Sequence, residues 1–137
     1  MVRDDRAFYD TNILIAYLFR EENRFETARK ALKKHASKAI SIISIHEIHM
    51  YSVKFNVEDK FVKIKKPLHS LFKIIPINQD ICVKASYVRK DHKLPEIDAL
   101  ILATAVHEKY RHFYTFDKDF EKLNGKRIEE TIIHYLK

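Results

Sequence analysis

The segment LPEIDALILATAVHEKYRHFYTFD, residues 94–117, contains the elements that decide the fold. Its first part predicts a helix that is apolar on nearly every face, from Ile97 through Val106, so we expect this helix to lie deep in the core. Residues 113–116 then predict a strand that ends at Asp117. A buried helix that leads directly into a strand is typical of an α/β protein with a parallel sheet.

The rest of the chain alternates in the same way between segments of strand length and segments of helix length. Apolar and β-branched runs predict further strands at residues 7–9, 40–43 and 74–77. Helical periodicity predicts further helices at residues 13–18, 23–32, 47–51, 58–71 and 79–92, the last of them capped by Asn78. Residues 128–136 fit a last strand or a short helix equally well.

Strands separated by helices imply right-handed crossovers between parallel neighbours. We therefore predict an α/β fold, a three-layer sandwich with a central parallel sheet of about five strands. Pro76 should either place the strand at residues 74–77 at an edge of that sheet or shorten it, because proline cannot donate a ladder hydrogen bond. The length of 137 residues suits a single domain that spans residues 1–137.

The composition is that of a water-soluble protein that favours polyanionic partners. Hydrophobic residues make up 46% and charged residues 33%, and no apolar run approaches the roughly 18 residues that a membrane span requires. The charged start of the chain, residues 1–6, does not resemble a secretory signal, so we expect a cytoplasmic protein without a membrane partner. A net charge of +7 favours nucleic acid, because clustered cations displace phosphate counterions; a lysine-rich surface that only maintains solubility is the alternative.

Four acidic residues each follow a predicted strand or begin a predicted helix: Asp10, Glu47, Asp98 and Asp117. The carboxyl ends of parallel strands meet at one edge of a sheet, so these side chains should converge there. Converging carboxylates repel one another unless a cation neutralises them. Oxygen ligands suit Mg²⁺ or Mn²⁺, whereas zinc sites use cysteine and histidine. The sequence therefore predicts a site for one or two divalent cations.

Each of these acids also has a purely structural interpretation. Asp10 could cap a helix, and Glu47 could complete a capping box with Ser44. Asp98 in a first helical turn suits the helix dipole, and Asp117 could form an Asx-turn. These roles are compatible with metal binding, because a cap position also places a carboxylate at the rim of the sheet. The predicted convergence of all four acids favours the metal site.

Spacing and composition exclude two other kinds of site. His46 and His49 flank Glu47 at i and i+3, whereas the zinc-protease helix needs histidines at i and i+4. Gly125 is the only glycine, so the chain has no glycine-rich phosphate-binding loop. A phosphoryl-accepting regulatory domain would also gather acids at a sheet edge, but no single aspartate stands out as its acceptor.

Four segments around these acids resemble the acidic motifs of the PIN-domain ribonucleases, particularly the VapC-type toxins. They are YDTNILI (residues 9–15), SIHE (residues 44–47), EIDALILATA (residues 96–105) and YTFDKDF (residues 114–120). Their order and spacing match the family, and the first and last segments together are fairly specific, whereas SIHE alone is weak. The resemblance implies a five-stranded parallel sheet between helices and a Mg²⁺- or Mn²⁺-dependent endonuclease that acts on RNA.

By this resemblance Asp10, Glu47 and Asp98 are the core metal ligands, and Asp117 completes the site directly or through water. Asp119 is a competing fourth acid, because family members differ in which aspartate of the last motif is used. One departure from the family is the tail, which predicts a less regular last strand than family members often have.

Further residues of the same segments have implied roles. Asn12 and Thr115 would orient the carboxylates or a water molecule. Lys118 and Lys122, which belong to a group of basic residues that begins within the last motif, are candidate contacts for the RNA backbone.

The expected reaction is hydrolysis of an RNA phosphodiester bond by a metal-activated water, which leaves 5′-phosphate and 3′-hydroxyl ends. The small VapC-like size implies a toxin that pairs with an antitoxin protein and forms a homodimer. The alternative is a PIN-like domain with weak or no catalysis that binds RNA or another protein as a scaffold.

Overall fold

A six-stranded sheet forms the middle layer of the structure, a computed structural model that describes residues 5–137. The strand order is β3-β2-β1-β4-β6-β5. Neighbouring strands are parallel except for β5, which is antiparallel to β6. The strands are β1 (Arg6–Tyr9), β2 (Ser37–Ser41), β3 (Lys73–Ile75), β4 (His112–Thr115), β5 (Arg127–Ile128) and β6 (Thr131–Tyr135).

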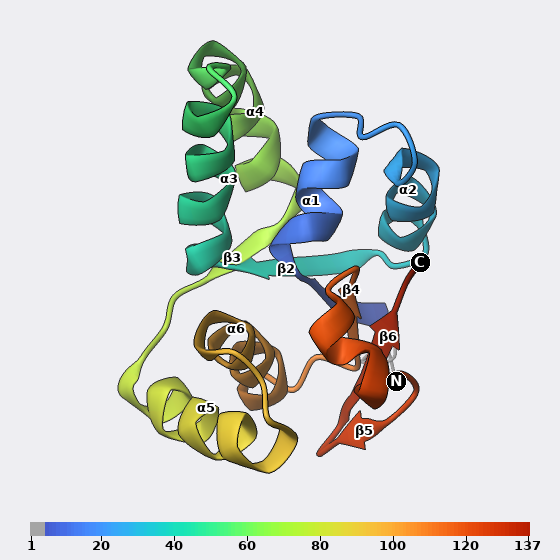
Figure 1. The fold of residues 1–137 in the computed structure, drawn as a ribbon, viewed down its shortest axis with the longest axis vertical. Coiled ribbons are helices and arrows are strands. Elements are labelled where there is room, and N and C mark those ends of the chain that lie inside the picture. The colour runs from blue at the N-terminus through green and yellow to red at the C-terminus, as the bar shows by residue number, and fades with distance from the viewer. Residues whose placement is uncertain (1–4) are drawn as a thin grey trace.

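Helices cover both faces of this sheet, so the predicted three-layer α/β sandwich is confirmed (Figure 1). One core lies between the sheet and α1 to α4 and includes Tyr9, whereas the other lies between the sheet and the pair α5 and α6 and includes Phe8. The helices are α1 (Thr11–Leu18), α2 (Phe25–Lys33), α3 (Ile42–Lys54), α4 (Glu58–Leu71), α5 (Gln79–His92), α6 (Glu96–His107) and the 3-10 helix η2 (Lys118–Leu123).

The helix predicted from the opening segment is α6, and it is deeply buried as expected. Between Ala99 and Val106, every residue except Leu100 is buried. Its partner α5 begins at the predicted cap, where the Asn78 side chain accepts a hydrogen bond from the Ile81 N–H at 2.9 Å. This pair covers one face of the sheet and brings the start of α6 to the carboxyl edge of β1 and β4.

The end of β2 differs from the prediction, and the difference moves Glu47. Strand β2 ends at Ser41, and Ile42 and Ile43 form the first turn of α3 instead of the end of a strand. The Ser41 hydroxyl accepts a hydrogen bond from the Ile43 N–H at 3.1 Å and thereby caps the helix. Periodicity cannot distinguish a short apolar strand from an apolar helical turn. Glu47 therefore lies in the second turn of α3 and not at its start.

The tail adds two strands, which resolves the ambiguity over residues 128–136. Strand β6 pairs in parallel with β4, and the short β5 runs antiparallel to β6. Gly125 has φ +78° in the turn before β5, where its N–H donates to the Ile133 carbonyl at 2.8 Å. The sheet has six strands rather than about five because β5 extends one edge, while β3, just before Pro76, forms the other edge as predicted.

No helix within residues 5–137 is long and apolar enough to cross a bilayer. The charged start of the chain, from which we expect a cytoplasmic location, includes residues 1–4, which lie outside the described residues. The assignment of residues 1–137 to one domain stays a prediction.

Three histidine rings, one from the loop after α2, one from β4 and one from β6, pack against one another at tilted angles. The ring centroids of His35 and His112 lie 4.5 Å apart, and those of His112 and His134 lie 5.0 Å apart. Nε2 of His35 shares a hydrogen bond with the Tyr114 hydroxyl at 2.7 Å. Burial, followed by the charge on His112, lowers the pKa of His35, and burial lowers the pKa of His134 to about 4. The imidazoles of His35 and His134 are therefore neutral near pH 7.

We expect these rings to make the fold sensitive to mild acid. A histidine in the unfolded chain has a pKa of about 6.5, whereas folded His134 has a pKa of about 4. Between these two values the unfolded state binds a proton that the folded state does not. The free energy of unfolding should therefore fall as the pH falls through that window. His134→Phe keeps an aromatic ring against Tyr114 and removes one titrating group.

Urea unfolding at about pH 7 and about pH 5 checks this expectation. The variant should lose less stability between the two conditions than the wild type, by on the order of 1 kcal/mol. Equal losses in the two proteins would contradict it.

Candidate functional site

Asp10 lies where β1 gives way to α1, and its carboxylate is held from two sides. Its Oδ1 accepts a hydrogen bond from the Thr11 N–H at 2.8 Å, which caps α1, and its Oδ2 accepts from the Thr115 hydroxyl at 2.7 Å. Asp10 is only 4% exposed. The capping role is therefore real, and it places a buried carboxylate at the carboxyl edge of the sheet.

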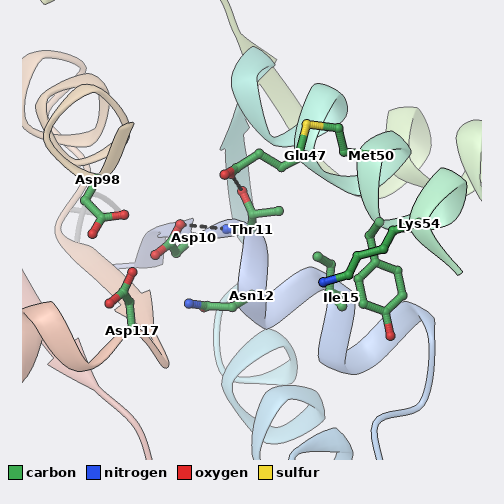
Figure 2. A pocket seen from close by; sticks show the side chains of 10 residues that line it. Asp10, Thr11, Asn12, Ile15, Glu47, Met50, Lys54, Asp98 and Asp117 are labelled. Atoms are coloured by element: carbon green, nitrogen blue, oxygen red, sulfur yellow. Dashed lines mark hydrogen bonds between the residues drawn. The ribbon is translucent and has the colours of Figure 1, made fainter. Parts of the chain in front are cut away.

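Asp98 and Asp117 approach the same point from α6 and from the end of β4. Asp98 lies in the first turn of α6. Asp117 follows β4 and caps η2, since its Oδ1 accepts a hydrogen bond from the Asp119 N–H at 2.9 Å. One carboxylate oxygen from each of Asp10, Asp98 and Asp117 lies within 4.8 Å of the other two, a group that we name the three-aspartate cluster (Figure 2).

Burial and mutual repulsion raise the pKa values of two carboxyl groups in this cluster. Burial raises the pKa of Asp10 to about 7, although hydrogen bonds from Thr115 and Thr11 oppose the shift. Burial, followed by the charges of Asp10 and Asp117, raises the pKa of Asp98 to about 8. The protein alone does not neutralise this charge, because no lysine or arginine of residues 5–137 forms an ion pair with the cluster.

Thr115 and Asn12 hold the backbone around the cluster. The Thr115 hydroxyl donates to Asp10 and accepts a hydrogen bond from the Asp117 N–H at 2.9 Å, so one buried side chain links two of the three acids. Asn12 Oδ1 accepts from the Phe116 N–H at 3.0 Å and ties α1 to the end of β4. The Thr115 contact with Asp10 is of the kind that a role in orienting carboxylates requires, whereas the Asn12 contact is with backbone.

Glu47 lies in the same pocket but outside the three-aspartate cluster. Its carboxylate accepts a hydrogen bond from the Thr11 hydroxyl (Figure 2). The same hydroxyl shares a hydrogen bond with the Ser44 hydroxyl at 2.8 Å. The predicted capping box of Ser44 and Glu47 is wrong, because Ser41 caps α3 and Ser44 contacts α1 instead. Thr11 therefore sets the position of Glu47 across the pocket from Asp98 and Asp117.

The remaining predicted residues do not belong to the three-aspartate cluster, although the charge of Asp119 helps to raise the pKa of Asp98. Asp119 is exposed on η2, and its backbone N–H, rather than its side chain, contacts Asp117. Lys118 is exposed and does not line the pocket. Lys122 donates from Nζ to the Lys93 carbonyl at 3.1 Å, which holds its ammonium at the turn between α5 and α6.

The pocket in front of the cluster has a volume of about 320 Å³. Its lining includes residues that the sequence analysis did not single out: Thr11, Ile15, Met50, Tyr51 and Lys54. The α3 residues among them share a helix face with Glu47, so helical spacing from Glu47 is the signal that could have found them. Thr11 lies within the first quoted motif, but its contact with Glu47 joins two helices and is not visible in the sequence.

The donor set fits a hard divalent cation. All three converging groups are carboxylates, which suit Mg²⁺ or Mn²⁺, and no cysteine or histidine of residues 5–137 joins them. Asp10 is buried, and the negative charges of the three carboxylates repel one another. A bound cation would offset this repulsion and so stabilise the folded state.

The profile of the PIN domain family matches residues 7–126, which is most of the chain. The chain belongs to the PIN domain family. This PIN domain is 25% identical to Ribonuclease VapC2 of Methanocaldococcus jannaschii over 143 aligned positions, which cover 94% of this chain and 96% of that protein.

Solved structures give the same answer for the fold. A toxin-antitoxin complex from Klebsiella pneumoniae matches this PIN domain with a TM-score of 0.70 and 34% identity, over 92% of this chain and 99% of that chain. VapC20 of Mycobacterium tuberculosis, described as a sarcin-ricin loop cleaving toxin, matches with a TM-score of 0.73 over 90% of this chain and 97% of that chain. Its identity of 19% limits that second likeness to the fold.

The crowded carboxylates predict that the metal-free PIN domain loses stability as the pH rises. An aspartate in the unfolded chain has a pKa of about 4, whereas folded Asp98 has a pKa of about 8 and keeps its proton up to that pH. Between those values the folded state binds more protons than the unfolded state, so the free energy of unfolding falls with rising pH. Asp98→Asn removes this titration and should raise the melting temperature in chelator at about pH 8, by on the order of a few degrees.

Added Mg²⁺ should raise the melting temperature of the wild type, because a ligand that binds only the folded state stabilises it, and should act less on Asp98→Asn. Asp91→Asn, at an exposed position of α5, is the matched control and should behave like the wild type. A lower melting temperature for Asp98→Asn than for the wild type in chelator at about pH 8 would contradict the destabilising repulsion among the three carboxylates.

Proposed function

We propose that this PIN domain is a Mg²⁺- or Mn²⁺-dependent endoribonuclease with the three-aspartate cluster at its active centre. The observation that carries the proposal is the convergence of three carboxylates, which no lysine or arginine of residues 5–137 neutralises, at the carboxyl edge of a parallel sheet. The relative named Ribonuclease VapC2 supports it, as does the net charge of +7, which suits a polyanionic substrate.

Asp10, Asp98 and Asp117 would hold the cation, and Glu47 is available across the pocket for a water molecule or a second ion. A bound divalent cation lowers the pKa of a coordinated water and offsets the negative charge that builds on the phosphate. We favour Asp117 over Asp119 as the last ligand, because the Asp119 side chain is exposed and outside the cluster.

The chain's own groups fix these positions before any substrate binds. Thr115 holds the Asp10 carboxylate and the Asp117 backbone, and Thr11 holds Glu47 at the opposite side of the pocket. We assign Glu47 the role of orienting the attacking water. The side-chain oxygen Oδ1 of Asn12 accepts a hydrogen bond from the Phe116 N–H. The side-chain nitrogen Nδ2 of Asn12 is therefore the group that can donate to a water or a carboxylate.

The first test is cleavage of total cellular RNA in Mg²⁺, in Mn²⁺ and in chelator. Asp10→Asn keeps the shape of the side chain but loses a charged ligand, so cleavage should fall by about 100-fold or more while the fold is retained. Asp91→Asn should cleave like the wild type. Cleavage by Asp10→Asn at the wild-type rate would show that the site is wrongly assigned.

The product ends test the nucleophile in the same experiment. Attack by water leaves 5′-phosphate and 3′-hydroxyl ends, whereas a 2′,3′-cyclic phosphate would mean attack by the ribose hydroxyl and would contradict the mechanism. RNA binding that is equal in chelator and in Mg²⁺, without any cleavage, would instead indicate the scaffold function.

We also propose that this PIN domain is a toxin that an antitoxin protein neutralises. The support is the 34% identity to a chain of the toxin-antitoxin complex from Klebsiella pneumoniae. The homodimer stays a prediction that rests on the resemblance to VapC-type toxins, and the cytoplasmic location stays a prediction that rests on the charged start of the chain.

Expression in a bacterial host tests this role. Strong expression of the wild-type chain alone should arrest growth, and coexpression of a small protein encoded beside it should restore growth and copurify with the chain. Asp10→Asn should not arrest growth, whereas Asp91→Asn should. Growth unaffected by the wild-type chain would count heavily against a toxin.

A further inference from the structure

The wall of the pocket opposite the three-aspartate cluster comes mainly from α3. Glu47, Tyr51 and Lys54 follow one another at i, i+4 and i+7, so a single face of the helix presents all three to the pocket. Figure 2 shows the Lys54 side chain extending from α3 toward Ile15 on α1. The pocket therefore has an acidic end at the aspartates and a basic end at Lys54.

The Lys54 ammonium does not neutralise the acids of the pocket. Lys54 is exposed, and none of the ion pairs formed among residues 5–137 includes it. Its Nζ lies 5.5 Å from the centre of the Phe55 ring. A lysine that served only to balance the carboxylates would contact them, so this ammonium is left to bind an anion from solution.

Distance separates Lys54 from the site of cleavage. Seven residues of an α-helix rise about 10 Å, so Lys54 lies about two helical turns beyond Glu47 along α3. Lys54 lines the same pocket as the three-aspartate cluster but lies at its opposite end. We therefore assign an anion on Lys54 to a different phosphate of the same strand.

Aromatic rings accompany the lysine from the pocket to the surface. The Tyr51 ring lies 4.7 Å from the Phe19 ring and 4.6 Å from the Phe55 ring, centroid to centroid, and Phe55 is 53% exposed. Lys60 Nζ lies 5.1 Å from the centre of the Phe19 ring. Exposed rings interleaved with cations are the usual surface for single-stranded nucleic acid, because bases stack on the rings and phosphates pair with the cations.

We propose that Lys54 binds a backbone phosphate of single-stranded RNA beside the scissile one and that Tyr51 and Phe55 support a neighbouring base. This inference rests on the proposed ribonuclease function and adds the residues that position the strand. Lys54 is a positioning residue, since it aligns the strand and does not touch the reacting atoms. Single-stranded RNA is the substrate class that fits, because only unpaired bases are free to stack on protein rings.

Charge and continuity favour RNA over a protein partner on this surface. Tyr51 and Lys54 themselves line the pocket of the aspartates, so the occupant of this wall is the strand that enters the site. The two lysines beside the rings, Lys54 and Lys60, complement phosphates. A protein partner on the same surface is an alternative that the experiment below distinguishes.

The test measures binding and cleavage separately. Binding of a fluorescently labelled single-stranded oligoribonucleotide is followed by anisotropy in the Asp10→Asn background over a range of salt concentrations. Adding Lys54→Ala should weaken binding by about tenfold and reduce the slope of log K against log salt by about 0.7, the value for one phosphate contact on a single strand. Lys54→Arg should restore both, and Lys90→Ala, an exposed lysine of α5, should change neither.

Cleavage provides the second measurement. With Asp10 intact, Lys54→Ala should raise KM by about tenfold and leave kcat nearly unchanged, because the contact holds the strand and not the reacting phosphate. Tyr51→Leu should weaken binding by about tenfold, whereas Tyr51→Phe, which keeps the ring, should not. Melting curves identify any variant that fails to fold.

Three outcomes would overturn the inference, and they differ in what else they affect. If the wild type cleaves RNA and Lys54→Ala has an unchanged salt slope and KM, the positioning role is wrong while the ribonuclease function stands. If Lys54→Ala and Tyr51→Leu release a copurifying protein without weakening RNA binding, the surface belongs to a protein partner. If the wild type neither binds nor cleaves RNA, the proposed function falls as well.

Discussion

The hydroxyl of Thr115 joins the ends of two neighbouring parallel strands at the centre of the candidate active site. It donates to the Asp10 carboxylate after β1 and accepts from the Asp117 N–H after β4. The strands themselves are paired in register, Tyr9 with Tyr114, so the buried threonine acts on two backbones that the sheet already holds. Asp98 then completes the cluster from the first turn of α6, whose position depends on the apolar core beneath the sheet.

That arrangement places like charges together at a cost. Burial and neighbouring charges raise the pKa values of Asp10 and Asp98 toward neutrality, and the fold supplies no ion pair to offset them within the part of the chain that the structure describes. A protein optimised only for stability would replace such groups or pair them. The persistence of an unpaired acidic cluster in a basic chain is the physical basis for assigning it a cation.

The same pocket has a second, different wall. Helix α3 carries Glu47 toward the acids and, two turns later, Lys54 away from them, with Tyr51 between. One helix thus sets the distance between the pocket end where hydrolysis is proposed and Lys54, which is proposed to bind a neighbouring phosphate. Helix geometry, rather than a flexible loop, would then decide which phosphate is presented to the aspartates.

The sequence alone determined much of this protein. Periodicity predicts the order of strands and helices and the buried α6, and the residue type at position 78 predicts the Asn78 cap. The rule that parallel strands share a carboxyl edge predicts that Asp10, Asp98 and Asp117 arrive at one edge. The tertiary structure decided the rest. It moved the start of α3 to Ile42, with Ser41 as its cap, turned an ambiguous tail into β5 and β6, and placed the Glu47 carboxylate against the Thr11 hydroxyl. Such contacts join residues far apart in the chain, and local patterns report which face a residue occupies but not which distant side chain meets it there.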